Sequence, residues 1–231
     1  PDTPDVEAVL FGTGGVAEGI APGAVAIDFS TIAATAAASF AARLGAGPGA
    51  FLLDVPVSGG PAGARDGTLT CMIGGAAEAV TAADPVLRAV GRTLTHLGPP
   101  GAGQVCKSAN QLIVSVTLLA VSEALALGRK AGLDPMAMRA ALLGGSARSF
   151  VLEHQARRII EGDETPGFRA GLMRKDLRLA AAAARDHGVF APATALAAQM
   201  MEALVASGRE GRDASSLGAL VAELSGLRRP G

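Results

Sequence analysis

The sequence predicts an α/β protein in which a layer of strands and helices is followed by an all-helical half. In residues 1–100, short apolar segments alternate with helical patterns, which is typical of a largely parallel sheet covered by helices. After Gly103 no strand pattern remains. The Pro99-Pro100-Gly101 turn separates the halves, so we expect one domain at 1–100 and an all-α domain at 101–231.

Turn residues and apolar runs place the elements of the first half. Pro1-Asp-Thr-Pro-Asp5 has the composition of a turn, and Asp5 or Thr3 is expected to cap a short helix at 6–10. The glycines at 12–15 form a loop that follows a helix and lacks the spacing of a dinucleotide-binding turn. Strands are expected at 23–29, 51–55, 67–73 and 93–97, and helices at 32–44 and 76–90.

One long helix dominates the second half. The pattern from Gln104 to Gly132 is helical and contains no Pro, and such a helix is roughly 40 Å long at 1.5 Å per residue. Because it is apolar over most of its circumference, we expect it to be buried, in part by another subunit. Shorter helices are expected at 135–143, 149–160, 168–187, 192–207 and 215–224.

Composition excludes several classes of function. A net charge of -1 with 3% aromatic residues and no Trp or Tyr is unsuited to nucleic-acid binding and predicts an aliphatic core. The three His are scattered, and Cys71 and Cys106 lack metal-ligand spacing, so no metal site is expected. The longest apolar run, 112–127, is shorter than the ~20 residues of a membrane span. With no signal-peptide pattern at the start, we expect a soluble, reduced, cytoplasmic protein without a membrane partner.

Lys107 is the first candidate for chemistry. It follows a glycine-rich turn near the start of the long helix, and Asn110 and Gln111 share its helical face at i+3 and i+4. Burial and the positive end of the helix dipole both lower the pKa of such a lysine, towards a value useful for proton transfer. Two carboxamides beside it can orient a hydroxyl or a carboxylate. The alternative is a solvated lysine that opens a helix.

Three further stretches carry polar groups. Ser58-Gly59-Gly60 follows a strand, where successive N–H groups and the hydroxyl can bind an anion; the alternative is a plain turn. Lys175 and Asp176 lie in a helix, where a solvated charge pair is the alternative. Ser30-Thr31 ends a strand, where an N-cap is the alternative. We assign no chemistry to Cys106 or His96.

These stretches, in this order, resemble the β-hydroxyacid dehydrogenase family over essentially the whole chain. The matching motifs are 1–5, 28–32, 54–60, Gly103–Gln111 and 175–177, with Gly67-Thr-Leu-Thr and Gly74-Gly75 between them. The resemblance implies an incomplete Rossmann-like parallel-sheet domain followed by an all-helical domain built on one long helix. It also implies that about 60 residues, a mononucleotide-binding half with the glycine-rich turn, precede Pro1 in family members.

The resemblance assigns roles residue by residue. Lys107 is the catalytic proton donor and acceptor for hydride transfer between NAD or NADP and a small carboxylate substrate. Cofactor contacts fall to Pro1, Thr31 and Lys175. The substrate is bound by Ser58, Gly59, Gly60, Asn110 and Gln111. The resemblance further implies a homodimer or homotetramer formed through the helical domain.

Within the family, the stretch 107–111 is most similar to the tartronate semialdehyde reductases, because many relatives have Asn at the position of Gln111. The expected reaction is therefore tartronate semialdehyde to glycerate. The alternatives are a 3-hydroxyisobutyrate dehydrogenase, another dehydrogenase or imine reductase of the superfamily, or a catalytically silent, truncated dimerisation scaffold.

Overall fold

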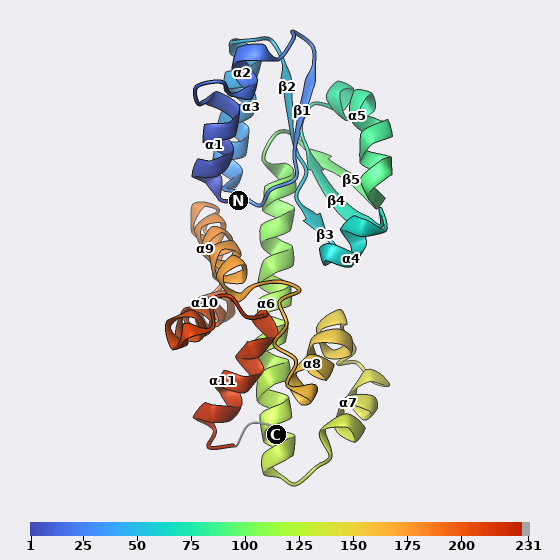
Figure 1. Cartoon of the computed structure of the whole chain (residues 1–231), viewed down its shortest axis with the longest axis vertical. Coiled ribbons are helices and arrows are strands. Elements are labelled where there is room, and N and C mark those ends of the chain that lie inside the picture. The colour runs from blue at the N-terminus through green and yellow to red at the C-terminus, as the bar shows by residue number, and fades with distance from the viewer. Residues whose placement is uncertain (228–231) are drawn as a thin grey trace. The chain divides into compact units, whose positions relative to one another are not determined.

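The computed structural model describes residues 1–227 and divides into two compact units, 1–110 and 111–231. The division falls within one continuous helix, α6 (Ala102–Lys130), which is 29 residues long. The predicted α/β class is confirmed, with strands in the first unit and helices throughout the second (Figure 1). The domain boundary at 99–101 stays a prediction.

The first unit is built on a five-stranded sheet. Strand β4 pairs with β2 and β3 along one edge and with β5 along the other, and β1 extends the sheet beyond β2. Pairing is parallel between β1 and β2 and between β4 and β5, and antiparallel where β4 meets β2 and β3. The strands are β1 (Val25–Asp28), β2 (Phe51–Asp54), β3 (Val57–Ser58), β4 (Leu69–Gly74) and β5 (Gly91–Gly98).

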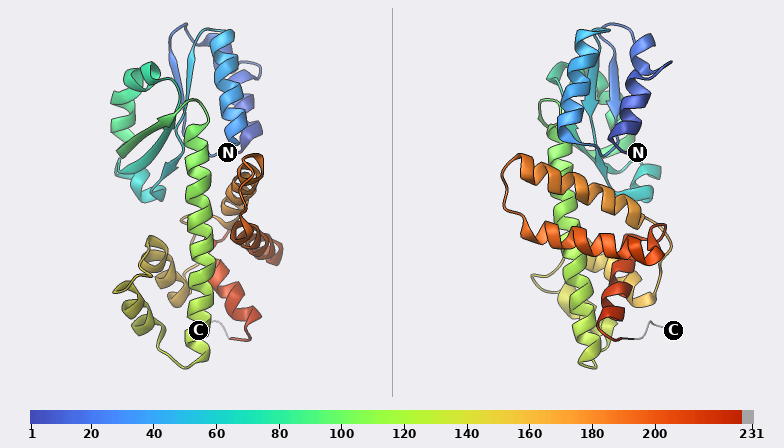
Figure 2. Two further views of the ribbon diagram at one scale, coloured as in Figure 1. Left: turned by 180° about the vertical axis from the view of Figure 1, so that it is seen from behind. Right: turned by 90° about the vertical axis from the view of Figure 1, so that its left-hand side faces the viewer.

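Helices cover both faces of this sheet (Figures 1 and 2). Side chains alternate between the faces of a strand, and β2 shows the result. Leu53 joins a core with α5, while its neighbour Leu52 joins a second core with α1 and α3. The helices are α1 (Thr3–Phe11), α2 (Val16–Gly19), α3 (Ala34–Ala46), α4 (Gly60–Arg65) and α5 (Ala77–Val90).

The starts of two helices differ from the sequence prediction. Helix α1 begins one turn earlier than expected, and its N-cap is Asp2, which forms a reciprocal capping box with Asp5. Helix α3 is not capped by Ser30 or Thr31; its N-cap is Ala33, which has no side-chain acceptor. Instead the hydroxyl of Thr3 accepts the hydrogen bond from the N–H of Ala33 at 3.1 Å.

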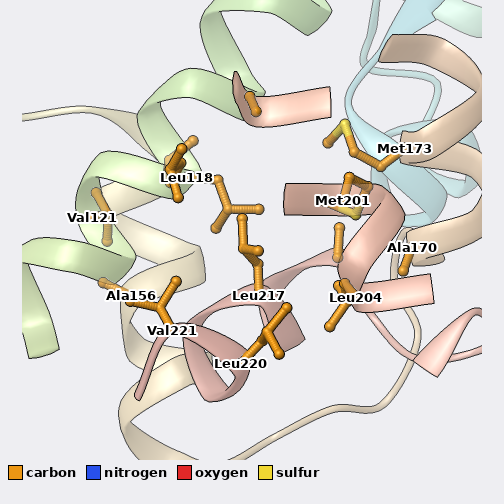
Figure 3. Packing of buried hydrophobic residues seen from close by; sticks show 14 of the residues in the cluster. Leu118, Val121, Ala156, Ala170, Met173, Met201, Leu204, Leu217, Leu220 and Val221 are labelled. Atoms are coloured by element: carbon orange, nitrogen blue, oxygen red, sulfur yellow. The ribbon is translucent and has the colours of Figure 1, made fainter. Parts of the chain in front are cut away.

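The second unit packs helices around the later turns of α6. Its core is almost wholly aliphatic, as the composition predicts: Leu118 and Val121 of α6 meet Met173, Met201 and residues of α11 (Figure 3). The other elements are α7 (Pro135–Leu143), the π-helix η1 (Val151–Gln155), α8 (Ala156–Glu161), α9 (Ala170–Asp186), α10 (Pro192–Leu204), the π-turn η2 (Val205–Arg209), the 3-10 turn η3 (Ala214–Ser216) and α11 (Leu217–Leu224).

The expectation that the longest apolar segment is too short to span a membrane is wrong for helix α6. In the described part of the chain it is the one helix long and apolar enough to cross a membrane by length and composition. Half of its most apolar window is buried inside the protein, and Leu118, Leu119 and Leu125 lie in the core of the second unit. This is the pattern of a core helix.

Candidate active site

The first turn of α6 is anchored to the end of strand β2 by Asp54. One carboxylate oxygen, Oδ1, accepts from the N–H of Gly101 at 2.7 Å, and Oδ2 accepts from the N–H of Gln104 at 3.0 Å. Asp54 thus satisfies N–H groups that a helix start leaves without intrahelical partners. Its side chain is almost fully buried, and this burial raises the pKa of Asp54 above its ordinary value, against the lowering effect of the two backbone donors.

Gly103 permits this contact between helix and sheet. A Cβ at this position would lie 2.4 Å from the carbonyl oxygen of Met72 and 2.6 Å from that of Asp54. Both atoms belong to strand backbone, so neither can move aside. Gly103 is therefore required for close packing, and Lys107 follows it by one turn of the helix.

Lys107 is buried, with 7% of its surface exposed. Its Nζ donates a hydrogen bond to the carbonyl oxygen of Val57 at 2.8 Å. Val57 precedes Ser58 in the short strand β3, so the fold brings the predicted proton donor to the predicted anion-binding loop. The alternative of a solvated lysine is excluded by this burial.

The Ser58-Gly59-Gly60 segment is more than a turn. Ser58 pairs with Thr70 in an antiparallel ladder, and Gly59 and Gly60 have φ values of 136° and 64°, which favour glycine. Helix α4 begins directly afterwards, with Pro61 in its first turn. The sequence prediction missed β3 and α4 because it interpreted the glycines and Pro61 as a turn.

In the second unit, Gln111 and Lys175 meet at one buried carboxylate. Nε2 of Gln111 donates to Oδ2 of Asp176 at 2.6 Å, and Nζ of Lys175 lies 3.1 Å from Oδ1. The side chains of Lys175 and Asp176 are only 12% and 4% exposed. The alternative of a solvated charge pair is therefore wrong.

The segment around Thr31 is held by side chains from several elements. Oδ1 of Asp28 accepts from the N–H of Ser30 at 2.9 Å. The carboxamide of Gln104 donates to the carbonyl of Ser30 at 2.9 Å and accepts from the N–H of Ile32 at 3.1 Å. Together with the bond from Ala33 to Thr3, these contacts fix the backbone on both sides of Thr31.

Pro1 lines an open pocket of about 530 Å³ in the first unit. Apolar side chains of α1 and β1 form most of its wall, and Asp28 and Ser30 add polar groups. The second oxygen of Asp28, Oδ2, is buried and finds no hydrogen-bond partner within residues 1–227. None of Lys107, Ser58 or Thr31 lines this pocket.

The structure therefore forms two groups of the predicted residues. Lys107 and Ser58 lie in the first unit, and Gln111 and Lys175 lie in the second. Half-buried Asn110 follows Lys107 by one helical turn. Sequence reasoning missed the residues that position these groups, namely Asp54, Gln104 and Asp176. The only available signal was that all three lie inside the motifs.

Comparisons with known proteins agree with this architecture. A family model described as the NAD-binding domain of 6-phosphogluconate dehydrogenase matches residues 1–98. A second, described as NAD-binding of NADP-dependent 3-hydroxyisobutyrate dehydrogenase, matches residues 101–221, more than half of the chain.

Individual proteins of known name that are similar to this chain belong to the same family. The chain is 41% identical over 217 residues to 2-hydroxy-3-oxopropionate reductase of Escherichia coli, covering 94% of this chain and 74% of that protein. It is 37% identical to 3-hydroxyisobutyrate dehydrogenase of Pseudomonas aeruginosa, covering 92% and 74%. The crystal structure of 3-hydroxyisobutyrate dehydrogenase from Salmonella typhimurium superposes with a TM-score of 0.86 at 32% identity, covering 95% and 76%. The chain belongs to the β-hydroxyacid dehydrogenases, a family of NAD(P)-dependent oxidoreductases.

Proposed function

We propose that this protein reduces tartronate semialdehyde to glycerate with NADH or NADPH, and that Lys107 is its catalytic proton donor. The observation that carries the proposal is the buried Lys107, hydrogen-bonded to Val57 beside Ser58. The identity of 41% to the Escherichia coli 2-hydroxy-3-oxopropionate reductase supports the choice of substrate.

Different residues of the chain carry out proton transfer and substrate binding in the proposed reaction. Reduced nicotinamide supplies a hydride to the aldehyde carbon. Lys107 donates a proton to the carbonyl oxygen as negative charge develops there, and accepts it in the reverse direction. A lysine suits this role because an ammonium can give up its proton, whereas a guanidinium cannot. Ser58, Gly59 and Gly60 bind the substrate carboxylate through a hydroxyl and backbone N–H groups.

Asn110 and Gln111 hold the 2-hydroxyl or the carboxylate of the substrate. Asp176 orients the carboxamide of Gln111 by accepting from its Nε2. A substrate with a methyl group in place of the hydroxyl leaves a polar group of this site without a partner, which costs binding energy. The two carboxamides therefore favour a hydroxylated C3 acid.

The pocket beside Pro1 offers a polar group that suits a dinucleotide. Asp28 presents a buried oxygen that finds no donor among the described residues, and it lines the same pocket as Pro1. A hydroxyl or amide donor of the cofactor satisfies such an oxygen. Thr31 contacts the cofactor from the segment that Gln104 fixes, and Lys175 contacts the nicotinamide end.

The proposal includes a homodimer or homotetramer formed through the helical unit, in the cytoplasm. Large apolar side chains remain exposed on helices of this unit, including Ile113 and Leu127 of α6 and Leu196 of α10. The proposal is that another subunit covers these side chains, since a surface that gathers exposed apolar groups marks an interaction site. Light scattering of the purified chain measures this state directly.

The test compares two aldehydes of equal length. Oxidation of NADH and of NADPH is followed with tartronate semialdehyde and with the semialdehyde of 3-hydroxyisobutyrate, which carries a methyl group instead of the hydroxyl. We expect kcat/KM to favour the hydroxylated substrate by about tenfold or more, the value of one hydrogen bond in a buried site. A preference for the methyl compound overturns the substrate, and absence of turnover with both overturns the activity.

A further inference from the structure

Gln104 connects the first turn of α6, which leads to Lys107, with the segment that contains Thr31. It is fully buried, in the first turn of the helix, and its N–H is held by Asp54 at 3.0 Å. Lys107 follows three residues later on the same helix. The side chain of Gln104 reaches in the other direction, to the segment that contains Thr31.

The two hydrogen bonds of this carboxamide bracket Thr31. Oε1 accepts from the N–H of Ile32 at 3.1 Å, and Nε2 donates to the carbonyl of Ser30 at 2.9 Å. In a parallel sheet, the backbone of one residue bonds to the groups on either side of a partner residue in this manner. Gln104 therefore acts as a substitute strand partner for a segment that lies beyond the end of β1.

We propose that Gln104 is a positioning residue that fixes the backbone at Thr31 relative to the start of α6, and hence relative to Lys107. The inference rests on the proposed function, in which Thr31 contacts the cofactor and Lys107 transfers the proton. Hydride and proton transfer require the reacting groups in one geometry, and small displacements cost rate. A single helical turn that carries Lys107 and also holds Ser30 and Ile32 meets this requirement.

The decisive variant is Gln104→Glu. When protonated, the new carboxyl has one acceptor and one donor, as the carboxamide has, and it preserves both bonds. When ionised it has no donor and repels the carbonyl of Ser30. The charged groups on the segments that contact Gln104 are Asp28, which accepts from the N–H of Ser30, Asp54, which accepts from the N–H of Gln104 itself, and Lys107 one turn along α6. Burial and the two carboxylates favour the protonated form at low pH.

The experiment measures the dissociation constant of NADPH and of NADH by cofactor fluorescence in the full chain. We expect Gln104→Glu to weaken binding about tenfold relative to wild type at about pH 8, and to restore it towards the wild-type value at about pH 5.5. The matched control is Gln199→Glu on α10, the same chemical change at an exposed position, which leaves binding unchanged at both pH values.

Hydrogen exchange provides a readout that needs no cofactor. Gln104→Leu is expected to speed exchange of the Ile32 amide about tenfold or more, while amides of β2 keep their wild-type rates. The inference is overturned if the ratio of the Gln104→Glu dissociation constant to the wild-type constant does not change with pH. It is also overturned if Gln104→Leu leaves the exchange rate of the Ile32 amide unchanged. Cofactor binding with this pH dependence but without turnover overturns the proposed reaction alone. Absence of cofactor binding by the wild type overturns the proposed function, and the exchange rate of the Ile32 amide then tests the role of Gln104 by itself.

Discussion

Oδ2 of Asp176 lies 2.6 Å from Nε2 of Gln111, in a part of the second unit where both side chains are buried. Lys175 approaches the other oxygen of the same carboxylate. Two residues that the sequence assigns separately, one to the substrate and one to the cofactor, thus share a single buried anion.

This sharing predicts a loss of stability when the charge of Asp176 is removed. Asp176→Asn weakens the contacts to Lys175 and Gln111, and we expect the free energy of unfolding to fall by about 2 kcal/mol, the value of a hydrogen bond to a charged group. Urea denaturation measures it. Asp186→Asn, near the exposed end of the same helix, is the matched control and should change stability by less than about 0.5 kcal/mol. Equal effects from the two variants would show that the buried contacts do not matter.

Substitution of Lys107 tests its catalytic role. We expect Lys107→Met to lower kcat by about 100-fold or more, because a general acid contributes typically 10²–10⁴. Lys107→Arg should fail as well, since arginine does not release its proton. Lys130→Met, at the exposed far end of the same helix, serves as the control. If Lys107→Met retains turnover within tenfold of wild type, the lysine is not the proton donor.

The buried carboxyl of Asp54 predicts a pH dependence of stability. Because burial raises the pKa of Asp54 in the folded protein above its ordinary value, the folded state holds this proton more tightly than the unfolded state does. The contribution of Asp54 to stability is therefore greatest at low pH and declines as pH rises from about 4 through the folded pKa.

Asp54→Asn removes this titration. The substitution also replaces one of the two carboxylate oxygens, each of which accepts from a backbone N–H, with an N–H donor. We therefore expect the variant to be less stable than wild type at every pH. The difference in unfolding free energy should be largest near pH 4 and should shrink as pH rises, as measured by denaturant titration at several pH values. Asp66→Asn, at an exposed position after α4, controls for a general effect of charge. A difference that grows with pH contradicts the raised pKa.

Among these variants, we expect Gly103→Ala to lower the free energy of unfolding the most. Gly103→Ala places a Cβ against two strand carbonyls that cannot move, and we expect a loss of about 3 kcal/mol or more, as for overpacking in a core. Gly45→Ala in α3 makes the same change where nothing lies within 4 Å. It should stabilise the protein by about 0.5–1 kcal/mol through helix propensity. Thermal unfolding of both variants separates close packing from the backbone freedom of glycine.

The sequence predicts the long helix and the alternation of strands and helices because both follow from the spacing of apolar residues. It predicts a largely parallel sheet but not the antiparallel pairing of β2 and β3 with β4. For β3 that pairing follows from the ten residues that separate it from β4, fewer than the crossover between parallel strands needs. The short β3 and α4 lack any periodicity to detect.

The site is predicted less completely than the fold. Motifs locate Lys107 and Lys175 because the chain has only three lysines, and they locate Ser58 because two consecutive glycines follow it. The roles of Asp54, Gln104 and Asp176 depend on burial and on partners 47 to 74 positions away in the chain. Local patterns contain no information on such contacts, and for this reason Asp176 is indistinguishable in sequence from a solvated charge.

Helix α3 takes its first N–H acceptor from Thr3, thirty positions earlier in the chain. Nucleation of a helix is costly because several residues are fixed for one hydrogen bond. The contact between Thr3 and Ala33 forms only when the residues between them have closed a loop. The N–H of Ala33 is therefore satisfied only once α1 lies in place beside the start of α3. We expect Thr3→Val to speed hydrogen exchange of the Ala33 amide about tenfold, the value of one hydrogen bond, although the substitution lies thirty positions away in the sequence. An unchanged exchange rate would show that this contact does not protect the start of α3.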